Sequence, residues 1–278
     1  MLSSQQVTAF ADELATQVPY DTGPRHLAGP GDARHVTHGL AAAGWDTVSD
    51  PLSPKVILVS PDRRHHLQFD PQPRSSARWR LRAESAHSKP GWHAEFGAHV
   101  PAEVLAGLTD ALVARTHVRS PSPLSELDAA GWLIDGRGMA YTDNCTVERH
   151  SGQGPRTVPW DQQGPVAWYI SVRDLPPDIG SSGTHLWHAT FHRGTPEHLV
   201  AAFFTALVDT APLQRGLVDP TATYGVTQDR SPLTAEQTAD AYTRRIKAIR
   251  ARARSAHRRQ THSATATVPP KPVPPARH

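Results

Sequence analysis

The stretch Trp92-His93-Ala94-Glu95-Phe96 decides the fold of this chain, because it returns further on as Trp187-His188-Ala189-Thr190-Phe191. In both stretches a proline follows the phenylalanine by five residues, at Pro101 and at Pro196. A sequence that repeats itself in this detail is built from one structural unit used twice. We therefore predict an internal duplication.

The tryptophans support the same prediction, because six of the seven form matched pairs. The pairs are Trp45 with Trp132, Trp79 with Trp168, and Trp92 with Trp187. The first pair ends two Ala-Ala-Gly-Trp segments, and the second pair lies in two strand-like runs. Each tryptophan can remove about 150–250 Å² from water, so packing in a core explains why they recur.

Each copy is expected to run helix, five strands, helix. In the first copy the opening helix spans Asp32 to Ala43 and the closing helix begins at Pro101. In the second copy the opening helix spans Ser125 to Ala130 and the closing helix begins at Pro196. This order predicts an α+β fold of two tandem repeats, each a small antiparallel sheet with helices packed on one face.

The pattern changes beyond the second copy, where Thr234 and Gln237 form a capping box at the start of a basic helix. The proline-rich end of the chain predicts an extended or disordered tail. The expected domains are an N-terminal segment 1–23, a first repeat 24–118, a second repeat 119–213, a linker 214–230, a basic helix 231–260, and a tail 261–278.

These repeated segments also resemble a known family. Leu27-Ala28-Gly29-Pro30-Gly31-Asp32, the Ala-Ala-Gly-Trp and Trp-His-Ala-x-Phe segments, and the helix Thr195 to Phe203 resemble the actinobacterial family called domain of unknown function 317. The resemblance covers about Arg25 to Ala211 as two tandem copies. Val100-Pro101-Ala102 departs from it by lacking the capping threonine. The family carries no known activity, so the resemblance implies no catalytic residue.

The composition argues against several classes of protein, including secreted, disulfide-linked and membrane-spanning ones. The single cysteine, Cys145, allows neither an internal disulfide nor a thiolate metal cluster. The N-terminus carries Asp12 and Glu13 and has no apolar signal region. The longest apolar stretch, Leu199 to Val208, is too short to cross a bilayer. We therefore expect a soluble cytoplasmic protein that does not insert into membranes.

The charge is divided unevenly along the chain. The sequence pI is about 9.2, but the segment from Arg244 to His278 contains ten basic residues and no acidic one. Without that segment, 19 basic residues remain against 26 acidic ones. The body is therefore acidic and the C-terminal arm basic, and their electrostatics differ.

The histidines do not build a recognisable catalytic or metal motif. His93-Ala94-Glu95 has the His-x-Glu spacing of zinc deaminases, but that site needs a Cys-x-x-Cys partner. His188 and His192 share one face of a strand and lack a third metal ligand. We expect no metal, no cofactor and no enzymatic activity. His93, Glu95, His188 and His192 together remain a candidate ligand face.

Two basic surfaces are candidates for binding anions or nucleic acid. The first is an alternating row on one strand, Arg78, Arg80 and Arg82, which the second copy replaces with Ala167, Tyr169 and Ser171. This row could also be a solvated face or pair with carboxylates of the second copy. The second surface is the arm, represented by Arg244, Arg245, Arg252 and Arg259.

The function predicted from sequence is therefore a binding protein with a tandem-repeat body and a basic arm that contacts nucleic acid or an acidic protein. The apolar stripe Tyr242–Ile246–Ile249 could instead pack on the body or pair helices between subunits. One alternative is an enzyme or small-ligand binder with a site between the two repeats, using the arginine row, His93 and Glu95. Another is a scaffold with an exposed apolar patch. The oligomeric state stays open.

Overall fold

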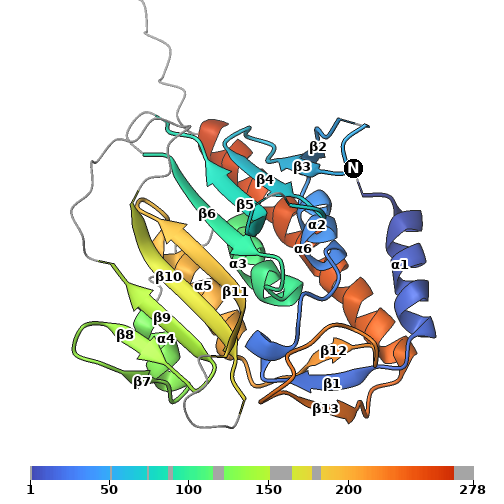
Figure 1. Ribbon diagram of the computed structural model, residues 1–278. Helices are drawn as coiled ribbons and strands as arrows, with labels where there is room; N and C mark the ends of the chain where they lie inside the picture. The colour runs from blue at the N-terminus through green and yellow to red at the C-terminus, as the bar shows by residue number, and fades with distance from the viewer. Residues whose placement is uncertain are drawn as a thin grey trace, which may run out of the picture.

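The computed structural model describes residues 2–50, 52–73, 75–86, 90–114, 122–150, 165–176 and 183–265, except the side chains of 257 and 259–265. Over these residues the chain forms an α+β fold with six α-helices, one 3-10 helix and two antiparallel sheets (Figure 1). The polyproline segment of the predicted tail, residues 269–275, lies outside the described residues.

Ten strands form the larger sheet, in the order β2-β3-β4-β5-β6-β11-β10-β9-β8-β7. Five come from the first copy: β2 (Asp46–Thr47), β3 (Val56–Val59), β4 (His65–Phe69), β5 (Ala77–Ala83) and β6 (Trp92–Gly97). Five come from the second copy: β7 (Leu133–Ile134), β8 (Met139–Tyr141), β9 (Cys145–Arg149), β10 (Val166–Asp174) and β11 (Thr184–His192).

The predicted duplication is confirmed by the order of the elements. The first copy runs α2 (Arg34–Ala42), β2 to β6, α3 (Ala102–Ala114), and the second runs α4 (Pro123–Ala129), β7 to β11, α5 (Glu197–Val208). The two repeated Trp-His-Ala stretches are β6 and β11, which pair with each other through Glu95 and Thr190. The two small sheets are thereby joined into one sheet with a symmetrical strand order.

The core lies between this sheet and the helices behind it in Figure 1. The strands contribute two of the tryptophan pairs, Trp79 with Trp168 and Trp92 with Trp187, and α5 contributes Phe203 and Phe204. Trp45 and Trp132 pack from just before the first strand of each copy. Helices α3 and α5 cross closely, because a Cβ added at Gly107 would lie 2.6 Å from the Cβ of Ala206. The core therefore explains the recurrence of the tryptophans without a ligand.

A second, three-stranded sheet has the order β12-β1-β13. It combines β1 (Tyr20–Gly23) with β12 (Leu213–Arg215) and β13 (Thr227–Arg230), so the segment expected to be a linker contributes strands. Helix α1 (Ser4–Thr16) precedes β1 and begins with a capping box at Ser3. The 3-10 helix η1 (Arg25–Leu27) follows β1 and leads into the first repeat.

The last element is the basic helix α6 (Ala235–Thr265), which packs against α1, α2 and α3. Its predicted capping box is confirmed, because the Gln237 amide donates to Thr234 Oγ1 and the Thr234 amide donates to the Gln237 side chain. Tyr242, Ile246 and Ile249 are buried. The apolar stripe of α6 thus packs on the body of the same chain.

Candidate functional site

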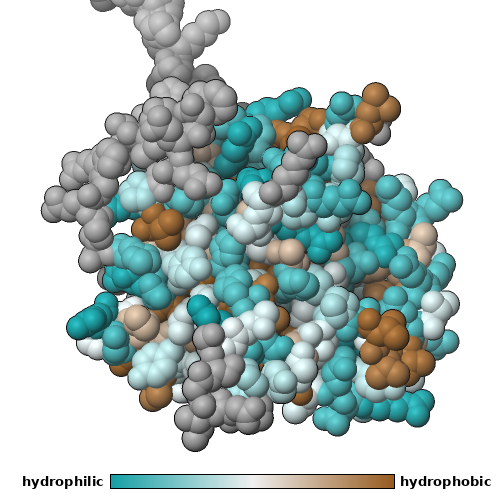
Figure 2. All heavy atoms as spheres, viewed as in Figure 1, coloured by the Kyte–Doolittle hydropathy of each residue, from teal (hydrophilic) through white to brown (hydrophobic). Residues whose placement is uncertain are grey.

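Four of the residues selected from the sequence meet on the side of the sheet that faces away from α3 and α5. Arg80 lies opposite Glu95 and Arg82 lies opposite His93 in the pairing of β5 with β6. Arg80 Nε donates to Glu95 Oε1 at 3.0 Å, while Arg82 is exposed. Figure 2, seen from this side, shows mainly hydrophilic residues over the sheet.

Arg78 does not join this group. A bulge between Ala77 and Trp79 interrupts the alternation of side chains along β5. The guanidinium of Arg78 lies 5.2 Å from the centre of the Phe69 ring and donates to the Ala98 carbonyl at 3.3 Å. Burial lowers the pKa of Arg78. The expectation that all three guanidiniums project together is therefore wrong for Arg78.

The histidines of the predicted ligand face lie at the junction of the two copies. The rings of His93 and His192 stack with centroids 3.5 Å apart, and His188 stacks on Tyr169 at 6.1 Å. Burial, with a smaller contribution from His192, lowers the pKa of His93 to about 4. Burial also lowers the pKa of His188. The sheet brings these residues together, and their role as a ligand face stays a prediction.

The described parts of the chain contain neither a candidate metal site nor a candidate membrane span. No group of three His, Cys, Asp or Glu side chains there is placed to hold a metal ion. Likewise, no described helix combines the length and apolar character needed to cross a membrane.

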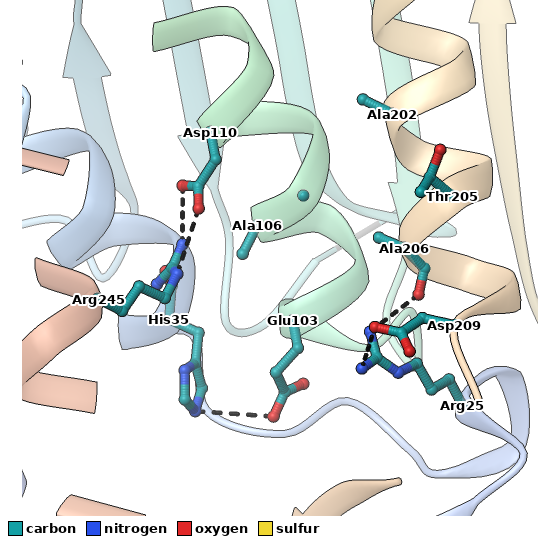
Figure 3. Close-up of a pocket in the computed structure, with 11 residues that line it drawn as sticks. Arg25, His35, Glu103, Ala106, Asp110, Ala202, Thr205, Ala206, Asp209 and Arg245 are labelled. Carbon is teal, nitrogen blue, oxygen red and sulfur yellow. Dashed lines mark hydrogen bonds and ion pairs between the residues drawn. The ribbon is translucent and has the colours of Figure 1, made fainter. Parts of the chain in front are cut away.

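A cavity of about 460 Å³ lies on the opposite side of the sheet, between α3 and α5 (Figure 3). Its wall includes small residues of both helices and charged residues from several elements. The lining residues are Arg25, His35, Glu103, Ala106, Gly107, Asp110, Ala202, Thr205, Ala206, Asp209 and Arg245. This is the space between the two repeats, but it lies across the sheet from Arg80, His93 and Glu95.

Two ion pairs stand on either side of the cavity (Figure 3). Arg245 of α6 makes a bidentate pair with Asp110 of α3, at 2.8 and 3.2 Å, and donates to the His35 carbonyl. Arg25 Nη2 lies 2.7 Å from Asp209 at the end of α5. Burial raises the pKa of Asp110, and Arg245 opposes that shift. The pairs join the core helices to segments outside them.

A third group surrounds Glu103 at the N-terminal turn of α3. Arg215 of β12 contacts both carboxylate oxygens, at 2.6 and 2.9 Å, and His35 Nε2 lies 3.6 Å from Oε1. Burial acts to raise the pKa of Glu103, but Arg215 and His35 hold it below its ordinary value. Burial lowers the pKa of His35, against the effect of Glu103. His35 is therefore neutral near pH 7.

Of the residues that line the cavity, only Arg245 was predicted from the sequence as a binding residue. A signal was present in the alignment of the two copies, because Pro101 of the first corresponds to Pro196 of the second. That alignment places His198 opposite Glu103 and Thr205 opposite Asp110. The two carboxylates are therefore not required by the repeated fold, and this difference could have marked them.

The arm residues divide between the inner and outer sides of α6. Arg244 and Arg252 are exposed, whereas Arg245 turns inward to Asp110. The side chain of Arg259 lies outside the described residues. The helix therefore offers a basic outer side and uses one of the predicted anion-binding residues to hold itself on the body.

Comparison with known proteins shows that part of the chain matches a protein family. Two segments, residues 59–118 and 144–213, match the family described as SPDY: Domain of unknown function (DUF317). No curated protein and no solved structure matches the chain. The first segment contains β4, β5, β6 and α3, and the second contains their counterparts β9, β10, β11 and α5. Two segments of the chain therefore match the SPDY domain, DUF317, and their shared order of elements is consistent with two tandem copies.

Proposed function

We propose that this protein binds nucleic acid through the outer side of α6, with α1 and the first SPDY copy holding the helix in place. The observation that carries the proposal is the division of α6 into a buried apolar side and an exposed cationic side. Contacts to phosphates require positive charge on a firmly held element and no particular base sequence.

The inner side of α6 is held by both apolar and charged contacts. Tyr242 is 4 % exposed and packs edge-on against Phe10 of α1, with ring centroids 4.7 Å apart. Ile246 and Ile249 are buried beside it, and the Arg245–Asp110 pair adds a charged contact to α3. These contacts fix which side of the helix faces solvent.

The outer side carries Arg244, Lys247, Arg252 and Arg254, all exposed. None of the four has a hydrogen bond or a close ion pair to another described residue, but Arg252 is near enough to Asp110 to lower the pKa of that carboxyl. Because the helix rises about 1.5 Å per residue, these cations extend over about 15 Å. Like charges this close repel one another, and a row of phosphates would offset the repulsion.

An acidic protein is the other partner that this charge would suit, and the composition of the outer side argues against it. Protein interfaces depend on aromatic or large aliphatic side chains at their centre. Between Arg244 and Arg254 the only exposed apolar side chains are those of Ala248 and Ala251. The surface offers charge without an apolar anchor, as phosphate contacts require.

The test uses the full chain and the fluorescence anisotropy of labelled DNA and RNA across a salt series. We compare the R244Q/R252Q/R254Q variant with R63Q/R137Q/R230Q, which removes equal charge from exposed arginines of the body. The arm variant should lower the slope of log affinity against log salt by about 0.9 for each lost contact to double-stranded DNA. The control variant should keep the slope of the wild-type protein.

Equal slopes for the two variants would refute the role of α6, and absence of binding at low salt would refute the proposed function. Substitution is preferable to ending the chain near Ser231, because such a truncation also removes Tyr242 and Arg245 from the body. A third variant, R80Q/R82Q, asks whether the sheet face takes part. We expect a smaller change there, because Arg80 is already paired with Glu95.

A further inference from the structure

We infer that the cavity between α3 and α5 binds a small zwitterionic molecule of the class of a free amino acid (Figure 3). This inference is independent of nucleic-acid binding, because it concerns the inner side of α6 and not its outer side. It rests on the size of the cavity, on the way it is built, and on the balance of charge around it.

The size and shape of the cavity follow from the close crossing of α3 and α5. Gly107 and Ala206 hold the two helices together, so the walls are set by the fold. Ala106 and Ala202 line the same space with small side chains. A volume of about 460 Å³ is within the range of small-molecule sites and too small for a folded partner or a nucleic-acid strand.

The arginines at and beside the cavity lie outside the two matched segments. Arg215 belongs to β12, Arg245 belongs to α6, and Arg25 belongs to η1. Glu103, which pairs with Arg215, and Asp110, which pairs with Arg245, have no carboxylate counterpart in the second copy. A partly buried ion pair contributes little net stability to a fold. A need for stability therefore does not explain why several such pairs surround one cavity.

The two arginines at the wall keep capacity to donate. Arg245 uses one hydrogen from each of its three nitrogens on Asp110 and the His35 carbonyl. Arg25 likewise donates to the Ala211 and Ala206 carbonyls and pairs with Asp209. A guanidinium has five N–H groups. Each of these arginines donates three of them to described residues, so two remain that donate to no described residue. A ligand carboxylate could accept them.

The carboxylates at the wall keep capacity to accept. Asp110 and Asp209 are 26 % and 46 % exposed, and Glu103 is 19 % exposed. A carboxylate accepts about four hydrogen bonds, more than the arginines supply here. A ligand ammonium group could donate to these oxygens.

The balance of charge selects a ligand that carries both signs. The lining carries Arg25 and Arg245 beside the carboxylates of Glu103, Asp110 and Asp209. Arg215 pairs with Glu103 from outside the lining, and His35 is neutral. A polyanion would meet three carboxylates, and a polycation would meet two arginines. A zwitterion places its carboxylate near an arginine and its ammonium near a carboxylate, while its side chain contacts the alanines.

The experiment screens the full chain with each standard amino acid by thermal shift and measures the best ligand by calorimetry. At a concentration about a hundredfold above its Kd, the ligand should raise Tm by about 5 °C. The amide of that ligand lacks the carboxylate and its N-acetyl derivative lacks the ammonium. Both derivatives should bind at least tenfold more weakly, because each loses one ion pair with the wall.

Filling the cavity provides the structural control. The A202L variant extends a side chain into the cavity without touching a charged pair, and A248L makes the same change on the exposed side of α6. A202L should abolish binding and A248L should preserve it, with A202V as a smaller change if A202L folds poorly. The inference is overturned if no amino acid binds at about 10 mM, a concentration that detects millimolar affinity. It is equally overturned if the derivatives bind as well as the parent, or if folded A202L or A202V binds normally.

Discussion

The first SPDY copy places Glu103 and Asp110 on α3, where the second copy places His198 and Thr205 on α5. Both helices nevertheless pack on the same side of one sheet and cross each other at small residues. The repeated fold therefore needs the apolar positions of these helices and does not need the carboxylates. Differences of this kind between the copies indicate where the molecule departs from a purely structural role.

The same comparison holds on the other side of the sheet. Arg80 and Arg82 of β5 correspond to Tyr169 and Ser171 of β10, so the basic pair belongs to the first copy alone. The buried tryptophan that precedes each pair, Trp79 or Trp168, is the same in both copies. The first copy thus carries most of the charge, and the second carries the larger share of the aromatic core.

The largest expected effect concerns the tryptophan core that both copies share. Trp187 is 2 % exposed and its Nε1 donates to the His26 carbonyl at 2.9 Å, whereas its counterpart Trp92 is 8 % exposed. W187A should lower the free energy of unfolding by about 5 kcal/mol and W92A by about 3 kcal/mol, because the first change also leaves a buried carbonyl unpaired.

Urea denaturation of the two variants measures this difference. W187F separates the two contributions, because phenylalanine fills part of the cavity and cannot donate to His26. Equal destabilisation by W187A and W92A would show that the two copies share the core evenly, which contradicts the predicted asymmetry.

The next largest effect concerns a carboxylate that the first copy carries and the second copy lacks. E103Q leaves Arg215, whose side chain is 2 % exposed, without its carboxylate partner. Breaking such a pair should cost about 3 kcal/mol of unfolding free energy. H198Q, the matched change in the second copy, should cost less, about 1 kcal/mol, because it leaves the buried Arg215–Glu103 pair intact.

The pH dependence of unfolding provides a second measurement on E103Q. The pKa of Glu103 in the folded protein is held below its ordinary value of 4.5, so its contribution is complete above that pH and is lost as the pH falls further. E103Q should remove this acid-side loss. An unchanged acid profile would mean that Glu103 is not the group stabilised by Arg215.

The fold was predictable because its signals are local or repeated. The alternation of Trp79 and Leu81 with polar residues predicts a strand with one buried side, and the register confirms it. The repetition of such runs predicts the second copy. Pairing of β6 with β11 was not predictable, because nothing in either strand specifies which edge it meets.

The candidate site was less predictable, for physical reasons. Arg215 and Glu103 are 112 positions apart, and the three-residue strand that carries Arg215 is too short to show a period. Arg78 was misplaced because alternation assumes an uninterrupted strand, and a bulge reverses the side it faces. Arg245 was predicted to bind an anion, but it pairs with a carboxylate of the same chain. Helical spacing predicts which side of a helix a residue lies on, but not which residue it contacts.

The smallest expected effect concerns the histidines at the junction of the copies. His93 and His188 hold equivalent positions, but only His93 stacks at 3.5 Å on another histidine, His192. Burial and then His192 lower the pKa of His93 from 6.5 to about 4, with Glu95 opposing the shift. The folded protein therefore prefers neutral His93 more strongly than the unfolded chain does.

The sign of the pH effect follows from that preference. Stability from neutral His93 is complete above about pH 6.5 and is lost as the pH falls toward 4, because the unfolded chain takes up the proton first. With allowance for partial solvent screening, the loss between pH 7 and pH 5 should be about 1 kcal/mol. H93Q should remove that loss, while H188Q should remove less, because His188 stacks on the uncharged ring of Tyr169. Urea denaturation at both pH values measures the difference, and the other buried histidines cancel because every variant retains them. Equal pH dependence in H93Q and H188Q would show that the stacked pair adds nothing to the asymmetry between the copies.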